Sequence, residues 1–279
     1  MKTGYADLHL HTLFSDGTYA PEELIAQSKK AGLSAISIVD HDTISGIKPA
    51  LDMAATEGIE VIPGIELTAD YDGREVHILG YCLDCTTPGF KERLEELRKN
   101  RIDRIYQMLE RLGKMGLSLE PDSVFKLGKG TVGRLHIARA MVEKGIVGSV
   151  AEAFSRYIGD KSSAYVCNFN LPPEKAVELI KKAGGIPVLA HPYSLGGDEL
   201  LFKFIGYGIM GLEVYYPEHT SSMVRHYLAV TDKFNLLATG GSDCHGQAKP
   251  EVRIGSLKIP YSLVERIKEA KAGLERKRR

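Results

Sequence analysis

The stretch "DLHLHTLFSDG", residues 7–17, places two histidines one position apart at the end of an apolar strand and a carboxylate in the turn that follows. Alternate side chains of a β-strand share one face, so His9 and His11 project together. Asp16 lies in the Ser-Asp-Gly turn. A single histidine in such a strand is most often a hydrogen-bonded core residue, but a His-x-His pair that runs into an acidic turn favours a metal site.

Segments with strand and helix patterns alternate after this motif. A helix is predicted from Pro21 to about Gly32, since proline suits a first helical turn and glycine a helix end. A second helix leads to Gly58, and another is expected at 172–185. Further strands are predicted at 35–40, 59–67, 74–83, 186–192, 211–216 and 236–245. This order is typical of parallel strands joined by crossover helices, as in an α/β barrel or an open α/β sheet.

The alternation is interrupted by a purely helical region. Apolar residues recur at helical spacing between Leu94 and Leu112, and shorter helices follow to about Tyr165. The sequence therefore predicts a discontinuous barrel domain, residues 1–98 and 166–279, with a helical insertion at 99–165 that forms a cap.

Composition and charge place few restrictions on the partners of the chain. Its 279 residues fit one large α/β domain with an insertion, and 36 basic residues balance 36 acidic ones. Residues 266–279 are basic, which favours a solvated helix end. Four cysteines and no signal-peptide pattern predict a cytoplasmic protein without disulfides. No apolar run is long enough for a membrane span, and no obligate protein partner is implied.

Polar residues gather at the predicted strand ends. Six of the nine histidines belong to this set, and burying so many rings without partners would be costly. Imidazole and carboxylate ligands suit Zn, Mn or Fe, and a single ion takes only about four to six of them, so two or three divalent ions are predicted. The candidate metal ligands are His9, His11, Asp16, His41, Glu66, His77, His191, Asp243 and His245.

The ordered pieces "DLHLHTLFSDG", "IVDHDTISG", "IPGIELTA", "VHILGY", "LAHP" and "GSDCHG" together resemble the polymerase-and-histidinol-phosphatase (PHP) superfamily of metal-dependent phosphoesterases. The resemblance covers nearly the whole chain. It implies an α/β fold, a distorted, TIM-like (β/α)7 barrel with a trinuclear metal site at the carboxyl ends of the strands.

The resemblance also implies a role for each candidate ligand. One ion would be bound by His9, His11, Glu66 and Asp243, a second by Glu66, His77 and His191, and a third by Asp16, His41 and His245. Catalysis would run through a metal-bound hydroxide, because metal ions lower the pKa of bound water toward about 7. The catalytic residues, acting through this metal-bound hydroxide, would be His9, His11, Glu66, His191 and Asp243.

Three neighbours of the ligands also receive predicted roles. Asp7 and Asp40 are expected to orient ligand histidines through the free ring nitrogen. Cys244 lies between two ligands and is expected to face away from them by strand parity.

The sequence of the predicted cap indicates which branch of the family the chain resembles. Its stretches "TVGRLHIARAMVEKG" and "AFSRYIGDKSSAYV" resemble nucleoside 3′,5′-bisphosphate phosphatases and 5′-to-3′ exonucleases acting on short RNA. The resemblance implies that Arg134 and His136 reach the substrate phosphate, with Lys161 as a further candidate. Gly133 and Arg134 precede a predicted helix, and both a helix N-terminus and an arginine side chain favour a bound anion. Arg134 could instead pair with the surface of the cap.

The predicted activity is hydrolysis of a phosphate ester in a nucleoside 3′,5′-bisphosphate or in short 5′-phosphorylated RNA. A histidinol-phosphatase activity is the first alternative, since such enzymes share the metal motifs. A non-catalytic nucleic-acid-binding or regulatory module that keeps the ions for stability is the second. A metal-dependent amidohydrolase is the third.

Overall fold

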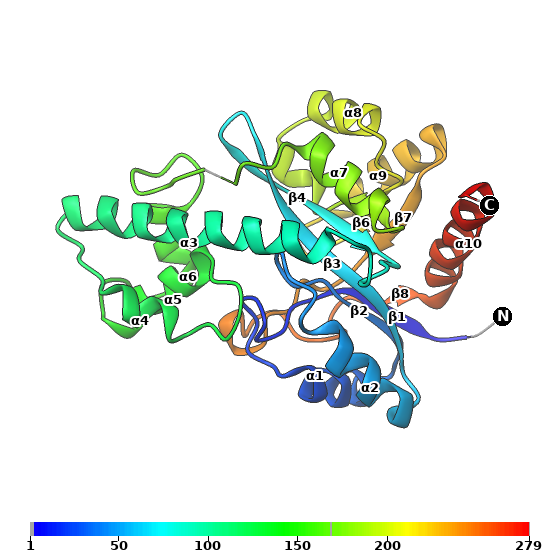
Figure 1. Cartoon of the computed structure of the whole chain (residues 1–279), viewed down its shortest axis with the longest axis horizontal. Helices are drawn as coiled ribbons and strands as arrows, with labels where there is room; N and C mark the ends of the chain where they lie inside the picture. Colours follow the sequence, from blue (N-terminus) through cyan, green and yellow to red (C-terminus); the bar gives the residue numbers. More distant parts are fainter. Residues whose placement is uncertain (1–2, 168, 279) are drawn as a thin grey trace.

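The computed structural model describes residues 3–167 and 169–278. An eight-stranded sheet curls into a nearly closed barrel at the centre of the molecule (Figure 1), with strand order β7-β6-β5-β4-β3-β2-β1-β8. The strands are β1 (Tyr5–Leu10), β2 (Leu33–Ile38), β3 (Glu60–Tyr71), β4 (Arg74–Tyr81), β5 (Ile186–Leu189), β6 (Gly211–Tyr215), β7 (Leu237–Gly240) and β8 (Ile259–Pro260). This arrangement confirms the predicted α/β barrel.

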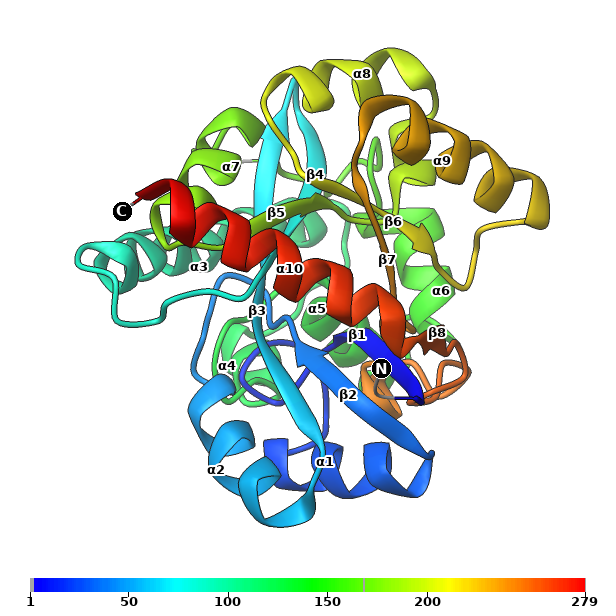
Figure 2. The same cartoon turned by 90° about the vertical axis from the view of Figure 1, so that its right-hand side faces the viewer.

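Helices surround the barrel and cross one of its ends (Figure 2). They are α1 (Pro21–Lys30), α2 (Ile47–Glu57), α7 (Pro173–Lys182), α8 (Asp198–Gly206), α9 (Ser221–Phe234) and α10 (Tyr261–Arg278), with short 3-10 turns η2 (Pro192–Leu195) and η3 (Gly246–Ala248). As predicted, α1 begins at a proline, and α2 ends at Gly58 in the left-handed conformation, with φ 71°. None of the helices in the described residues combines the length and apolar character that crossing a membrane requires.

The barrel closes where the chain leaving β7 meets β1. The Asp243 N–H donates to the His9 carbonyl over 2.8 Å, and the His11 N–H donates to the Cys244 carbonyl over 3.1 Å. Gly241 permits this approach, because a Cβ there would lie 2.3 Å from the backbone nitrogen of His9. The closure brings the beginning of the barrel sequence against its end.

One strand runs against the predicted direction. The sequence pattern indicates parallel strands, but β4 is antiparallel to both β3 and β5. The reason is a two-residue turn in which Asp72 and Gly73 have φ values of 54° and 76°, the signature of a tight hairpin. Glu66 and His77 consequently lie within strands rather than at their ends. The first half of β4 reaches the edge where the parallel strands end, since the Ala190 N–H after β5 donates to the His77 carbonyl.

The helices between β4 and α7 lie to one side of the barrel, on the left of Figure 1. They are α3 (Phe90–Lys114), α4 (Pro121–Phe125), α5 (Arg134–Glu143), α6 (Val150–Ala153) and a π-helical turn, η1 (Phe154–Ile158). The apolar side of α3 changes partners along its length. Leu97 packs into the barrel core, whereas Ile105 packs into a separate core with α4 and α5. The division into a barrel at 1–98 and 166–279 and a cap at 99–165 stays a prediction.

Candidate metal centre

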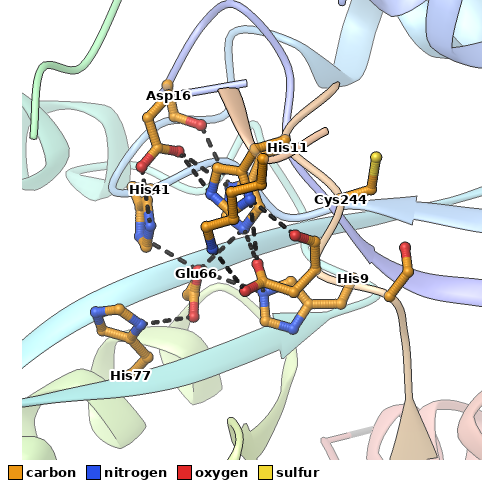
Figure 3. Close-up of polar contacts among 12 residues, drawn as sticks. His9, His11, Asp16, His41, Glu66, His77 and Cys244 are labelled. Atoms are coloured by element: carbon orange, nitrogen blue, oxygen red, sulfur yellow. Dashed lines mark hydrogen bonds and ion pairs between the residues drawn. The ribbon is translucent and has the colours of Figure 1, made fainter. Parts of the chain in front are cut away.

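The nine predicted ligands converge at the end of the barrel that faces α5 and α6. Figure 3 shows His9, His11, Asp16, His41, Glu66 and His77 directed toward one another, although they come from four strands and the loops after them. His191 follows β5, and Asp243 and His245 follow β7. Segments separated by most of the chain thus contribute to one cluster.

Glu66 lies at the centre of the cluster and is 1% exposed. Both of its carboxylate oxygens have imidazole nitrogens as neighbours. Glu66 Oε2 lies 3.4 Å from His9 Nε2, 3.3 Å from His11 Nε2 and 3.2 Å from His41 Nδ1. Glu66 Oε1 lies 2.8 Å from His77 Nδ1 and 3.3 Å from His191 Nε2. Glu66 therefore has the geometry of a bridge, with three of the histidines beside one carboxylate oxygen and two beside the other.

Two further carboxylates complete the donor groups. Asp243 Oδ1 lies 3.3 Å from His9 Nε2 and 3.1 Å from His11 Nε2. Asp16 lies 3.1 Å from His245 Nε2 through Oδ1 and 3.7 Å from His41 Nε2 through Oδ2. Donors around one tetrahedral ion with bonds of about 2.0–2.1 Å are about 3.3 Å apart, so most of these separations fit shared ions.

The nitrogen and oxygen atoms of the cluster are also suited to binding cations, because several of them have no hydrogen-bond partner. Among the described residues, four buried atoms of the cluster find no hydrogen-bond partner: His9 Nε2, His11 Nε2, Asp16 Oδ1 and His41 Nδ1. Three overlapping groups have donor atoms within 4.8 Å of one another: His11, Asp16, His41 and His245; His9, His11 and Glu66; and His41, Glu66 and His77. Buried donors without partners are costly, so this cluster is suited to metal ions.

Protons compete with metal ions for the same rings. Burial alone would lower the pKa of His11, but the neighbouring carboxylates of Asp243 and Glu66 raise this pKa to about 9. Burial likewise opposes the charged form of His77, while the Glu66 carboxylate raises its pKa to about 10. Since histidine binds a metal only when deprotonated, loading of the cluster with metal releases protons.

The ring nitrogens of His9 and His245 that face away from the cluster have hydrogen-bond partners. Glu213 Oε1 lies 2.8 Å from His9 Nδ1, and Glu213 Oε2 accepts a hydrogen bond from the backbone N–H of His191 over 2.8 Å. His245 Nδ1 donates to the Asp243 carbonyl over 2.8 Å. Such partners fix the orientation of a ligand ring. Glu213 was missed from the sequence, where its signal is a single carboxylate inside the apolar strand "GLEVYY".

Asp7 and Asp40 act on the loops rather than directly on the rings. Asp7 accepts hydrogen bonds from the Ser242 N–H over 2.8 Å and the Ser242 hydroxyl over 2.6 Å, which positions the segment before Asp243. Burial raises the pKa of Asp7 to about 6 despite these bonds. Asp40 accepts from the Ser15 hydroxyl over 2.5 Å, and Ser15 Oγ lies 3.4 Å from His11 Nδ1. The sequence predicts that Asp7 and Asp40 contact ligand rings directly. In the structure, Glu213 makes such a contact with His9 and Ser15 makes one with His11.

Two of the candidate ligands have unusual backbone conformations. His191 has φ 26° and Asp243 has φ 56°, values that cost about 1–3 kcal/mol for residues other than glycine and that concentrate at functional sites. Beside Asp243, the Cys244 sulfur points away from the cluster (Figure 3) and lies 3.2 Å from the Val252 carbonyl. This orientation agrees with the prediction from strand parity.

A cavity of about 220 Å³ adjoins the cluster and is called the metal cavity below. Three cationic side chains line it: Arg101, Arg134 and Lys249. Arg101 Nε donates to Asp42 over 2.5 Å, and Lys249 Nζ lies 3.1 Å from Asp243 Oδ2. The sequence interpretation missed Arg101 and Lys249. Arg101 could have been found as the one charged residue of the apolar 97–101–105 stripe of α3, where a buried cation needs a partner.

The predicted phosphate-binding residues differ in position. Arg134 begins α5, lines the metal cavity, and donates to Glu75 over 3.0 Å and to Asp160 over 2.6 Å. His136 is buried, and its Nδ1 accepts a hydrogen bond from the Gly133 N–H over 3.2 Å. Lys161 is exposed. Neither His136 nor Lys161 is among the described residues that line the cavity, so only Arg134 is placed for direct contact.

His136 leads to a prediction about acid stability. Burial lowers its pKa to about 4, so the folded protein favours the neutral ring. The unfolded chain takes up the proton near pH 6.5, and stability is therefore lost as the pH falls from 6.5 toward 4. We expect His136→Asn, whose side-chain oxygen can still accept from Gly133, to gain about 2 kcal/mol relative to wild type between pH 7 and pH 5. Denaturant unfolding of both proteins at each pH measures this difference, and a pH-independent difference would contradict it.

Comparisons with known proteins agree with this geometry. The family model of the PHP domain matches residues 7–153. A 5′-3′ exoribonuclease from Haemophilus influenzae is 34% identical over 86% of this chain and 89% of its own. A 3′,5′-nucleoside bisphosphate phosphatase from Chromobacterium violaceum is 30% identical over 86% of each chain. The crystal structure of a protein assigned as a metal-dependent phosphoesterase from Bifidobacterium adolescentis superposes with a TM-score of 0.86 at 32% identity, covering 94% of both chains.

The match is thus both to the sequence motifs and to the whole fold, and it extends beyond the residues that the family model covers. It confirms the predicted resemblance, the predicted class of phosphoester hydrolase and the dependence on metal ions that the donor groups indicate. The chain therefore belongs to the PHP family.

Proposed function

We propose that the protein hydrolyses phosphate esters of nucleotides, with nucleoside 3′,5′-bisphosphates or short 5′-phosphorylated RNA as its substrates. The observation that carries this proposal is the metal cavity, in which seven of the nine candidate ligands and three cationic side chains line one small space. A phosphate bound there would meet positive charge from several sides. The names of the relatives from H. influenzae and C. violaceum support nucleotide and RNA substrates.

The metal ions are proposed to be two or three divalent ions, of Mn, Fe or Zn. Residues of the cluster would hold them in the three sets that the resemblance implies: His9, His11, Glu66 and Asp243; Glu66, His77 and His191; and Asp16, His41 and His245. When bound, such ions supply a water-derived nucleophile near neutral pH and neutralise charge on the phosphate oxygens.

The side chains of the chain itself would bind and orient the phosphate. Arg134 is held in place by Glu75 and Asp160, so its guanidinium is preorganised at the edge of the cavity. Lys249 adds a second positive charge beside Asp243. The Tyr216 hydroxyl donates to Asp243 Oδ2 over 2.9 Å and keeps this carboxylate oriented. These residues are proposed to position the ester while the candidate metal ligands hold the ions.

The proposal is tested by a panel of substrates offered to one preparation with Mn²⁺. We expect inorganic phosphate to be released from adenosine 3′,5′-bisphosphate, or nucleotides from a short 5′-phosphorylated oligoribonucleotide, and activity to disappear after chelation of the metal. Turnover of histidinol phosphate alone would favour the first alternative. A preparation with metal bound that cleaves no phosphoester would favour a non-catalytic module, and cleavage of amides or lactones alone would favour an amidohydrolase.

A further inference from the structure

A second and larger cavity continues from the metal cavity. It has a volume of about 920 Å³ and is called the side groove below. On the side of the cap it is lined by residues of α5, α6 and η1, and on the side of the barrel by residues that follow β5, β6 and β7. The two cavities share five lining residues: Phe154, Tyr193, Tyr216, Asp243 and Lys249. The side groove is therefore the continuation of the metal cavity.

The sizes of the two cavities suggest a division of roles. The metal cavity, at about 220 Å³, is smaller than the range of about 300–1,000 Å³ that small-molecule sites occupy. It can take a phosphate group, but a nucleotide needs further space. The side groove lies within that range. A substrate whose phosphate sits at the candidate ligands would extend its remaining part into the groove.

Tyr193 gives the side groove an aromatic surface at its junction with the metal cavity. Its ring is stacked on Tyr216, with centroids 5.7 Å apart and an angle of 29° between the planes. The edge of its ring also meets His219, with centroids 5.5 Å apart. These neighbours hold the ring in place, yet Tyr193 remains 37% exposed. A rigid ring with exposed surface in a cavity is suited to stacking against a planar aromatic ligand.

The charges of the side groove favour an uncharged occupant. Beyond the junction, three carboxylates, those of Glu143, Glu218 and Glu251, line it together with one arginine, Arg139. Glu218 is exposed at the edge of the groove, and its carboxylate can accept hydrogen bonds from an occupant. A chain of further phosphates would be repelled by such a lining. A nucleoside is uncharged and carries N–H and O–H donors that a carboxylate can accept.

We propose that the side groove binds the nucleoside of the substrate, with the base stacked on Tyr193. This inference rests on the proposed nucleotide substrate. It assigns the recognition of the base to Tyr193 and separates it from the recognition of the phosphate, which belongs to Arg134 and the ions.

The test compares two substrates that differ only in the base. One is adenosine 3′,5′-bisphosphate, and the other is the same ribose bisphosphate with a methoxy group in place of adenine. For wild type we expect a higher kcat/KM with the nucleotide. Tyr193→Ala should lower the ratio of the two kcat/KM values about tenfold, through loss of one stacking contact, and Tyr193→Phe should restore it. Tyr106→Ala, which removes an exposed tyrosine of α3 that lines neither cavity, is the matched control.

Binding of the product provides a second measurement. Adenosine 5′-monophosphate should inhibit wild type competitively, and its inhibition constant should rise about tenfold in Tyr193→Ala but not in Tyr106→Ala. An unchanged ratio and an unchanged inhibition constant in Tyr193→Ala would overturn the inference while leaving the proposed function intact. Failure of wild type to hydrolyse the nucleotide, with retained activity on another phosphoester, would instead overturn the proposed function.

Discussion

Replacement of Glu66 by glutamine is expected to lower kcat/KM about a thousandfold, because metal-ion catalysis is worth several kcal/mol and the two donor groups share this carboxylate. Both oxygens of Glu66 lie within 3.4 Å of histidine nitrogens. An amide has the same shape but carries no negative charge and has only one oxygen. Elemental analysis of the purified variant should find fewer metal ions per chain than in wild type.

Glu60→Gln is a matched control for this substitution. Glu60 is the first residue of the same strand, where it contacts the Tyr261 hydroxyl and accepts a hydrogen bond from Lys268 Nζ over 2.7 Å. Its replacement can affect stability, but metal content and activity should be retained. If Glu66→Gln bound the full complement of metal and turned over substrate at the wild-type rate, the bridging role of Glu66 would be wrong.

Replacement of Arg134 by alanine is expected to lower kcat/KM about a hundredfold, since charge-assisted hydrogen bonds contribute about 1.5–3 kcal/mol each. The fold should survive, because Glu75 keeps Arg104 as a partner over 2.8 Å and His77 over 2.9 Å. Arg134→Lys should retain part of the activity, as it keeps the charge but loses the planar pair of donors. Steady-state kinetics with the nucleotide substrate measure both effects.

The control for Arg134 is Arg156→Ala on η1. Arg156 is exposed, pairs with Glu152 over 2.5 Å and lines neither of the two cavities. It should leave kcat/KM unchanged. A variant Arg134→Ala with normal kcat/KM but a reduced midpoint of thermal unfolding would show that Arg134 has only a structural role, as in the alternative that it pairs with the surface of the cap.

The sequence predicts most of the donor set because its chemistry is local. The pair His9 and His11 shares a face by strand parity alone, and that local signal needs no knowledge of the fold. The direction of β4 was predicted wrongly, because an alternating pattern does not reveal strand direction. The signal that decides it is the Asp72-Gly73 turn, which is typical of a hairpin.

The partners of the ligands were harder to predict than the ligands themselves. Glu213 touches His9 only because β6 and β1 lie in the same barrel, and nothing near residue 213 indicates this. His136 has the same sequence signature as a phosphate ligand but turns back to cap its own helix. The contact of Glu213 depends on tertiary packing, which periodicity and motif spacing do not contain, whereas that of His136 is a local cap bond between residues three positions apart.

The contact between the chain leaving β7 and β1 has a consequence for biosynthesis. Translation delivers His9 and His11 to the folding chain early, whereas Asp243 and His245 follow only after β7 has been made. A nascent polypeptide on the ribosome therefore carries these imidazoles before Asp243, one of their carboxylate neighbours, has been synthesised. Any chain that terminates before Asp243 lacks both the closing contact and two of the donors, so the inorganic centre can be completed only after nearly all of this polypeptide has been synthesised.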